Sequence, residues 1–112
     1  QIAPPPYAPV DTISGTAHTA TRADAGKYLR CTSDSSVTIV FEDDDFDVGT
    51  EIHFEQAGNG TVIFMGDTAV TVIDQRDGYD HVTPYKGAVV TAKCVAAATW
   101  KLIGPHGSVL TA

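Results

Sequence analysis

Apolar and polar residues alternate along much of the chain after residue 26. In KYLRCT (27–32), Leu29 and Cys31 fall on one face of an extended segment. In VTIVF (37–41), the repeat places Val37, Ile39 and Phe41 together. Neighbouring side chains of a β-strand point to opposite faces, so a period of two predicts strands that bury one face.

Three further segments between residues 51 and 74 have strand character. EIHFEQ (51–56) places Ile52 and Phe54 on its apolar face, TVIFM (61–65) is an apolar run, and AVTVID (69–74) alternates again. The polar face of the first of these segments, Glu51-His53-Glu55, is either solvated or in contact with a partner.

Two glycine-containing turns separate these three strands. Gly58-Asn59-Gly60 is typical of a tight β-hairpin, because glycine adopts positive φ angles without steric cost. MGDT (65–68) is a second short turn. The spacing therefore predicts a three-stranded meander over residues 51–74.

The remaining C-terminal pattern predicts a loop and a hairpin. QRDGYDHVTPYKG (75–87) is polar and reads as the longest loop, and segments 88–97 and 99–104 form a final hairpin with Trp100 and Leu102 on one face. No window has the spacing of an amphipathic helix. We therefore predict an all-β fold, a single small antiparallel sandwich or flattened barrel of seven to eight short strands.

The N-terminal segment QIAPPPYAPV contains four of the six prolines. Proline fixes its own backbone angle and biases the preceding residue toward extended geometry. We expect residues 1–14 to form an extended proline-rich arm, anchored on a partner by Ile2, Tyr7 and Val10, and residues 15–112 to form the β-domain. A disordered leader is the alternative.

Length, composition and charge narrow the function classes. The chain has 112 residues, which is the usual size of a single domain. Its 43% hydrophobic content is typical of a folded protein. A formal charge of −7 would repel phosphate backbones, so we expect no nucleic-acid partner. No apolar run reaches ~18 residues, so we expect no membrane partner. The start shows neither region of a signal peptide.

The two cysteines, Cys31 and Cys94, each lie in an apolar segment. They read as small buried hydrophobes in a reducing compartment. A disulfide between them remains open, because spacing alone does not decide pairing. A zinc site is disfavoured, since there is no CxxC and no cysteine lies close to a histidine.

The run EDDDFDVG (42–49) has five carboxylates in its first six positions. Calcium needs six to eight oxygens around one point, and the EF-hand spacing fails here because no glutamate closes the loop. We expect a solvated turn without a bound metal, in which Phe46 turns inward and Gly49 permits a sharp entry into the next strand. Calcium binding is the alternative.

No catalytic constellation is visible in the sequence. The clustered acids lie beside one another, whereas a glycosidase needs two carboxylates held apart across a cleft. The four histidines, His18, His53, His81 and His106, are scattered without HxH or HExxH pairing. No nucleophile elbow or phosphate-binding loop is present. We therefore expect no enzyme activity and no cofactor, with a small glycan hydrolase as a distant alternative.

An ordered set of motifs carries a family resemblance. Tyr28-Leu29 is followed by F-x-x-G-T-x-I (46–52), Q-x-G-x-G-x-V (56–62) and W-x-L-x-G (100–104). This order resembles small β-domains of tailed-bacteriophage virion proteins, both capsid decoration (cement) proteins and tail-fibre or tail-spike appendages. The resemblance covers roughly residues 26–104 and leaves out the proline-rich start and the last eight residues.

The resemblance implies a virion structural role without enzymatic chemistry. The leading expectation is a capsid decoration protein that is made in the host bacterial cytoplasm, binds the major capsid protein on the outer surface of the shell, and forms a dimer or trimer. The alternative is a receptor- or glycan-binding tail-fibre module. The residues expected to contact a partner are those of the arm and the tyrosines of the long loop: Ile2, Pro4, Pro5, Pro6, Tyr7, Val10, Tyr79 and Tyr85.

Overall fold

A computed structural model describes residues 9–43, 46–67, 70–73, 79–104 and 107–110 of the chain. These residues contain one short 3-10 helix, η1 (Arg22–Asp24), and eleven strands. The strands are β1 (Val10–Ile13), β2 (Ala17–Ala20), β3 (Tyr28–Cys31), β4 (Val37–Phe41), β5 (Glu51–Gln56), β6 (Val62–Gly66), β7 (Thr71–Ile73), β8 (Tyr79–Val82), β9 (Val89–Ala96), β10 (Thr99–Ile103) and β11 (Gly107–Leu110).

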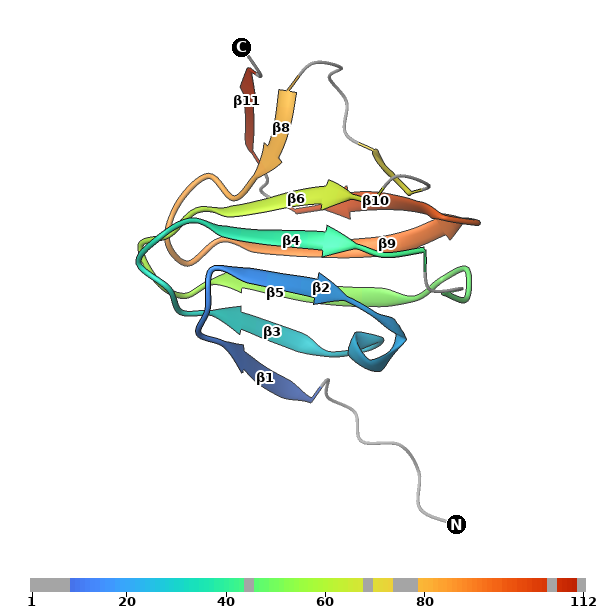
Figure 1. Cartoon of the computed structure of the whole chain (residues 1–112), viewed down its shortest axis with the longest axis horizontal. Helices are drawn as coiled ribbons and strands as arrows, with labels where there is room; N and C mark the ends of the chain where they lie inside the picture. Colours follow the sequence, from blue (N-terminus) through green and yellow to red (C-terminus); the bar gives the residue numbers. More distant parts are fainter. Residues whose placement is uncertain (1–8, 44–45, 68–69, 74–78, 105–106, 111–112) are drawn as a thin grey trace.

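The strands form two mixed sheets that face each other across a shared core (Figure 1). Sheet A has the order β1-β3-β5-β9-β10-β7, and sheet B has the order β11-β8-β6-β4-β2. The all-β prediction is confirmed. The predicted antiparallel arrangement is wrong, because β1, β3 and β5 run parallel, as do β2, β4 and β6. The predicted seven to eight strands were too few, since β1, β2, β8 and β11 were missed.

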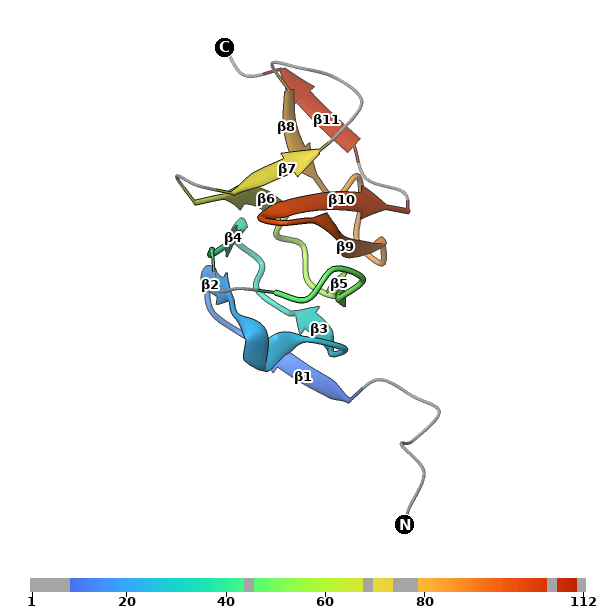
Figure 2. The ribbon, with the colours of Figure 1, turned by 90° about the vertical axis from the view of Figure 1, so that its right-hand side faces the viewer.

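The first six strands wind between the two sheets. Each odd-numbered strand joins sheet A, and the even-numbered strand that follows crosses to sheet B. We call the pairs β1–β2, β3–β4 and β5–β6 the first, second and third turns. Figure 2 looks along these strands and shows β2, β4 and β6 in one column beside β3 and β5. Each turn therefore hydrogen-bonds to the next on both sides of the core.

This winding contradicts the predicted meander over residues 51–74. β5 belongs to sheet A, β6 to sheet B and β7 to sheet A, so neither connection is a hairpin. The segment 57–61 is an arch that carries the chain across the core. Within the described ranges, the residues with positive φ are Gly26, Gly49, Gly87, Gly104 and Ala98, so neither Gly58 nor Gly60 is among them.

Close backbone packing explains the glycines of this arch. Gly60 N donates to Ser33 O at 2.9 Å, and Gly58 N donates to Cys31 O at 3.0 Å. A Cβ on Gly60 would lie within 3.0 Å of the Ser35 carbonyl, and one on Gly58 would meet the carbonyl of Ser33. The arch after β5 therefore rests directly on the arch after β3, and only glycine permits that approach.

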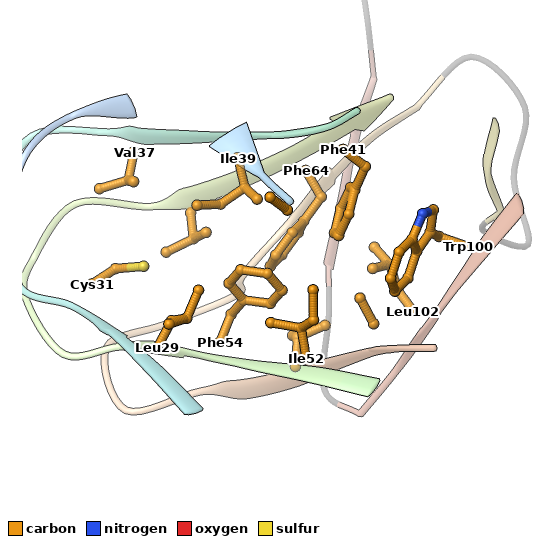
Figure 3. Packing of buried hydrophobic residues seen from close by; sticks show 14 of the residues in the cluster. Leu29, Cys31, Val37, Ile39, Phe41, Ile52, Phe54, Phe64, Trp100 and Leu102 are labelled. Atoms are coloured by element: carbon orange, nitrogen blue, oxygen red, sulfur yellow. The ribbon is translucent and has the colours of Figure 1, made fainter. Parts of the chain in front are cut away.

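The predicted apolar faces do form the core (Figure 3). Leu29, Cys31, Ile52 and Phe54 of sheet A meet Val37, Ile39 and Phe41 of sheet B, and all seven are fully buried. Trp100 and Leu102 close the core beside β9. The alternation in the sequence therefore identified the correct buried face of β3, β4, β5 and β10, although it gave no information on strand direction.

The four phenylalanines and the single tryptophan form one continuous aromatic series. Phe64 contacts Phe54 edge-on, with ring centroids 5.2 Å apart, and Phe54 contacts Phe41 at 5.9 Å. Phe41 stacks on Trp100 at 4.8 Å, and Phe46 meets the indole edge-on at 4.7 Å. The series runs from the middle of the core to the acidic run, so it connects the two.

In the C-terminal region, the predicted hairpin is confirmed and the predicted long loop is wrong. β9 and β10 pair antiparallel as predicted, with a register shift between Thr99 and Trp100. The predicted loop 75–87 is interrupted by β8, which pairs with β6 and β11. Pairing with strands distant in sequence imposed this extended geometry on a polar segment.

The predicted arm of residues 1–14 contains a strand. Its last residues form β1, which pairs with β3 at the edge of sheet A. Residues 1–8, which hold Ile2, Pro4, Pro5, Pro6 and Tyr7, lie outside the described residues. Cys31 and Cys94 are both buried free thiols, so they do not form a disulfide in this structure.

Candidate functional site

A cavity lies where the acidic run meets the β9–β10 hairpin. Its volume is about 250 Å³, and its lining residues are Glu42, Asp43, Phe46, Cys94, Ala97, Ala98 and Trp100. β4 ends at Phe41, so the first two acids follow the strand directly and stay exposed at the rim. The cavity thus combines a charged entrance with largely apolar walls.

The turn that forms one wall has the conformation expected from its sequence. Phe46 packs against the core, as predicted, and its ring meets Trp100 edge-on. Gly49 has a φ of 100°, a left-handed conformation that favours glycine. Its N–H donates to Cys94 O at 2.7 Å. This bond fastens the end of the acidic turn to β9.

Trp100 contributes the one buried side-chain nitrogen or oxygen without a hydrogen-bond partner among the described residues. Its side chain is fully buried, and Nε1 has no hydrogen-bond acceptor. Figure 3 shows this nitrogen at the upper edge of the ring, level with Phe41. A buried N–H that lacks an acceptor costs about 1–3 kcal/mol, so it marks a position where an acceptor would be gained.

The opposite wall is the turn between β9 and β10. Cys94 Sγ donates to Ala96 O at 3.3 Å, and burial raises the pKa of this thiol, so it stays protonated at neutral pH. Ala98 has a φ of 49°, which is uncommon for a residue with a Cβ. The hairpin therefore holds a strained residue at the cavity.

Glu42 and Asp43 have no cationic partner among the described residues. The basic side chains with known partners lie elsewhere: Lys27 pairs with Asp11, Arg30 with Glu55, and Lys93 with Glu51. Asp44 and Asp45 lie outside the described residues. The described part of the chain contains no group of three or more His, Cys, Asp or Glu side chains placed to hold a metal ion.

A second candidate surface is the edge of the first turn. Pro9 O and Ile13 O accept hydrogen bonds from Tyr28 N of β3 and from Thr32 N just after it, which fixes the direction of the β1 backbone. The N–H and C=O groups of Val10 and Thr12 consequently point away from sheet A. Thr16 O, just before β2, accepts from Thr38 N of β4, and Ala20 O accepts from Glu42 N just after β4. The N–H and C=O groups of Ala17 and Thr19 consequently point away from β4.

The interior of the first turn is closed by polar groups. His18 Nε2 lies 2.9 Å from Asp24 Oδ2, and Thr21 N donates to the same oxygen at 3.1 Å. Asp24 belongs to η1 and is only 6% exposed. Helix η1 therefore covers the end of the core beside β2. The outer edges of β1 and β2 are not paired with another described strand.

The outer face of sheet A carries a polar network. Glu55 Oε1 accepts hydrogen bonds from Tyr28 and Arg30, each at 3.0 Å. His53 Nδ1 lies 2.8 Å from Thr91 Oγ1. Desolvation and the bond to Glu55 raise the pKa of Tyr28. The polar groups satisfy one another across β3, β5 and β9, which is typical of a structural face.

Three of the predicted partner residues, Val10, Tyr79 and Tyr85, lie within the described part of the chain, and they are not brought to one place. Val10 is 60% exposed on β1, whereas Tyr85 is 57% exposed in the connection before β9. Two strands, β3 and β5, separate β1 from β9 in sheet A. Tyr79 is the first residue of β8, which two strands, β4 and β6, separate from β2 in sheet B. Of the three predicted residues that the structure describes, Val10 alone lies at the open edge.

The cavity itself was missed by sequence reasoning. The acidic run and the hairpin are about fifty residues apart in the chain, and no local pattern links them. The sequence showed only the parts: an acidic turn with an inward phenylalanine, and a strand with an inward tryptophan.

Comparisons with known proteins add no relative. No protein-family model matches the sequence, and no curated protein matches it significantly. Among the described residues, no helix has the length and apolar character needed to cross a membrane.

Proposed function

We propose that this chain is a non-enzymatic structural protein of a bacteriophage virion, a capsid decoration protein that binds the outer surface of the assembled shell. The open edge of the first turn is the observation that carries the proposal. The motif resemblance is the reason for proposing a virion protein. The exposed edges of β1 and β2 are a surface that another protein chain could bind.

The edge is suited to strand addition. Val10, Thr12, Ala17 and Thr19 are all exposed, and their backbone groups point away from both sheets. A strand edge of this kind accepts an extended segment from another chain, because main-chain hydrogen bonds form without a specific side-chain sequence. β1 is the edge strand of sheet A and β2 is the edge strand of sheet B, so an added segment could pair with either strand.

The same edges favour a flattened sandwich over a closed barrel. Sheet A ends at β1 and β7, and sheet B ends at β2 and β11. No described strand joins one sheet to the other by backbone pairing.

Binding at this edge would stabilise the shell by mass action. A protein that binds only the assembled shell shifts the equilibrium toward assembly. The proline-rich segment 1–9 directly precedes β1 in the sequence. A second copy of the chain is the simplest first partner, since it would complete the edges and give the expected dimer or trimer.

Undecorated, expanded capsids provide the direct test. Purified protein should bind them saturably, with a fixed stoichiometry, and should raise the temperature at which they disassemble. Thr12→Pro removes an outward N–H without touching the ladder to β3, so it should weaken capsid binding and leave the fold intact.

Thr12→Val is the matched control, because it changes the side chain and keeps the N–H. Unchanged capsid affinity in both Thr12→Pro and Thr19→Pro would remove the edge from the mechanism. A protein that ignores capsids but adheres to host cells would instead be a receptor-binding appendage.

A further inference from the structure

The first turn ends both sheets on the same side of the molecule, with β1 at the edge of sheet A and β2 at the edge of sheet B (Figure 2). We propose that a second copy of the chain completes both edges at once, by antiparallel pairing of β1 with β1 and of β2 with β2 around one two-fold axis. The dimer rests on the function proposed above, in which this edge is the assembly surface, and it adds the partner and the register.

Each edge has two residues whose backbone N–H and C=O groups point away from the sheet. They are Val10 and Thr12 in β1, and Ala17 and Thr19 in β2. In an antiparallel pair, residues of this kind face each other and exchange two hydrogen bonds. Val10 of one copy would therefore face Thr12 of the other, and Ala17 would face Thr19. Each edge is thus self-complementary about its middle residue.

The middle residues of the two edges, Asp11 and His18, occupy matching positions on the two sheets. Asp11 lies beside Leu29 in sheet A. His18 lies beside Ile39 in sheet B. Figure 3 shows Leu29 and Ile39 on facing sides of the core. One axis through Asp11 and His18, perpendicular to both sheets, would therefore relate two copies and complete both edges together.

The presence of two edges favours a second copy over a single extended segment. Stacked sheets lie about 10 Å apart, so one added strand completes only one of the edges. A partner for both edges must present two strands at that separation, each with the matching spacing of backbone groups. The first turn of a second copy meets these requirements by identity, and a two-fold interface is built from the same surface on both subunits.

The two edge strands contain few of the features that usually prevent such pairing. β1 has the sequence VDTI and β2 the sequence AHTA, so neither contains a lysine or a proline. Both strands pair with their neighbours in an unbroken register, without a bulge. Lysine, proline and bulges are common protection for a strand edge. Asp11 is the one acidic residue of the two strands.

The axis would bring Asp11 against Asp11 of the second copy. Cα atoms at such a position lie about 4.5 Å apart, and like charges directly opposite each other repel. Lys27 Nζ lies 2.9 Å from Asp11 Oδ2, so each copy already supplies the neutralising charge. His18 Nε2 is likewise bound, 2.9 Å from Asp24 Oδ2. The chain as a whole carries a formal charge of −7, which makes this neutralised edge a favourable place for two copies to meet.

Cysteine cross-linking tests the register. Asp11 meets its own copy at the axis, whereas Thr12 faces Val10 and lies two residues along the strand from its own copy. Asp11→Cys should therefore form a disulfide-linked dimer under mild oxidation, because Cα atoms about 4.4–6.8 Å apart can be bridged. Thr12→Cys is the matched control and should remain monomeric on a non-reducing gel, as should the wild type, whose thiols are buried. Equal cross-linking of both variants would overturn this register.

Analytical ultracentrifugation of the full chain, without capsids, measures the dimer separately from capsid binding. We expect a dimer at ~50 μM, which Thr12→Pro and Thr19→Pro should each weaken several-fold. A monomer or a trimer at that concentration would overturn the dimer. Binding of such a monomer to undecorated capsids would then leave the proposed function standing. A dimer that ignores capsids would instead support the interface and refute the virion role.

Charge variants test the part played by the ion pair at the axis. Lys27→Met leaves two bare carboxylates opposite each other and should weaken the dimer several-fold, and adding Asp11→Asn should restore it. Lys93→Met is the matched control, because it breaks the ion pair with Glu51 in the middle of sheet A and leaves the edge intact. Equal weakening by Lys93→Met would show that net charge, and not this edge, governs association.

Discussion

Asn59 donates two hydrogen bonds to one carboxylate oxygen of Asp34, from Nδ2 at 3.1 Å and from its backbone N at 3.2 Å. Asp34 lies in the arch that follows β3, and Asn59 lies in the arch that follows β5. The pair therefore joins two successive turns where the chain crosses between sheets. Because the two residues lie in different arches, this contact forms only when the second and third turns are stacked.

We expect Asp34→Ala to lower the free energy of unfolding by about 1 kcal/mol, because two hydrogen bonds between the arches are lost. Urea unfolding of Asp34→Ala, Asn59→Ala and the double variant would give the coupling energy of the pair. Ser36→Ala, an exposed position near Asp34, is the control. A coupling energy near zero would mean that the arches are held by their backbone alone.

Replacing Gly60 and Gly15 by alanine tests whether Gly60 is required because another backbone packs closely against it. Gly60→Ala should destabilise the protein by about 1–3 kcal/mol, since the new Cβ would collide with the Ser35 carbonyl. Gly15 has open space around it and no positive φ, so Gly15→Ala should change stability by less than about 0.5 kcal/mol. Chemical denaturation measures both, and equal effects would contradict the stacked arches.

A buried polar pair supports the third turn. Thr83 Oγ1 donates to Gln56 Oε1 and accepts from Val62 N at 2.9 Å, and both side chains are almost fully buried. Thr83→Val keeps the shape but leaves two buried groups unsatisfied, so it should cost about 2 kcal/mol or more. Thr83→Ser retains the hydroxyl and should cost less. The reverse order, measured by thermal unfolding, would exclude this network as a stabilising element.

The thiol of Cys31 should make stability depend on alkaline pH. Burial, together with the Glu55 charge, raises its pKa from 9.0 to about 11. The unfolded chain would lose this proton near pH 9, while the folded chain keeps it. Stability therefore falls as the pH rises from 9 toward 11, by up to about 2 kcal/mol.

Cys31→Ala should flatten this decline, whatever its effect on stability at neutral pH. Val37→Ala truncates the same core without removing a titratable group, so it should keep the wild-type slope. Both variants retain Tyr28, whose pKa is also raised, so its contribution cancels in the comparison. Parallel slopes for the wild type and Cys31→Ala would show that this thiol does not control the pH dependence.

The acidic run illustrates how far sequence reasoning reached toward the candidate site. The inward turn of Phe46 and the need for Gly49 followed from local chemistry, and both are confirmed. The meeting of this run with Cys94 and Trp100 could not be predicted, since contact between distant segments is decided by strand order.

The sequence by itself determined the β-class of the chain and the buried faces of β3, β4, β5 and β10. Both follow from a period of two, which is local and is the same for any strand with one buried face. Only the tertiary structure decided that β1, β3 and β5 run parallel, that Gly58-Asn59-Gly60 crosses the core, and where a cavity remains. Strand direction depends on pairing between segments far apart in sequence, and alternation carries no record of that pairing.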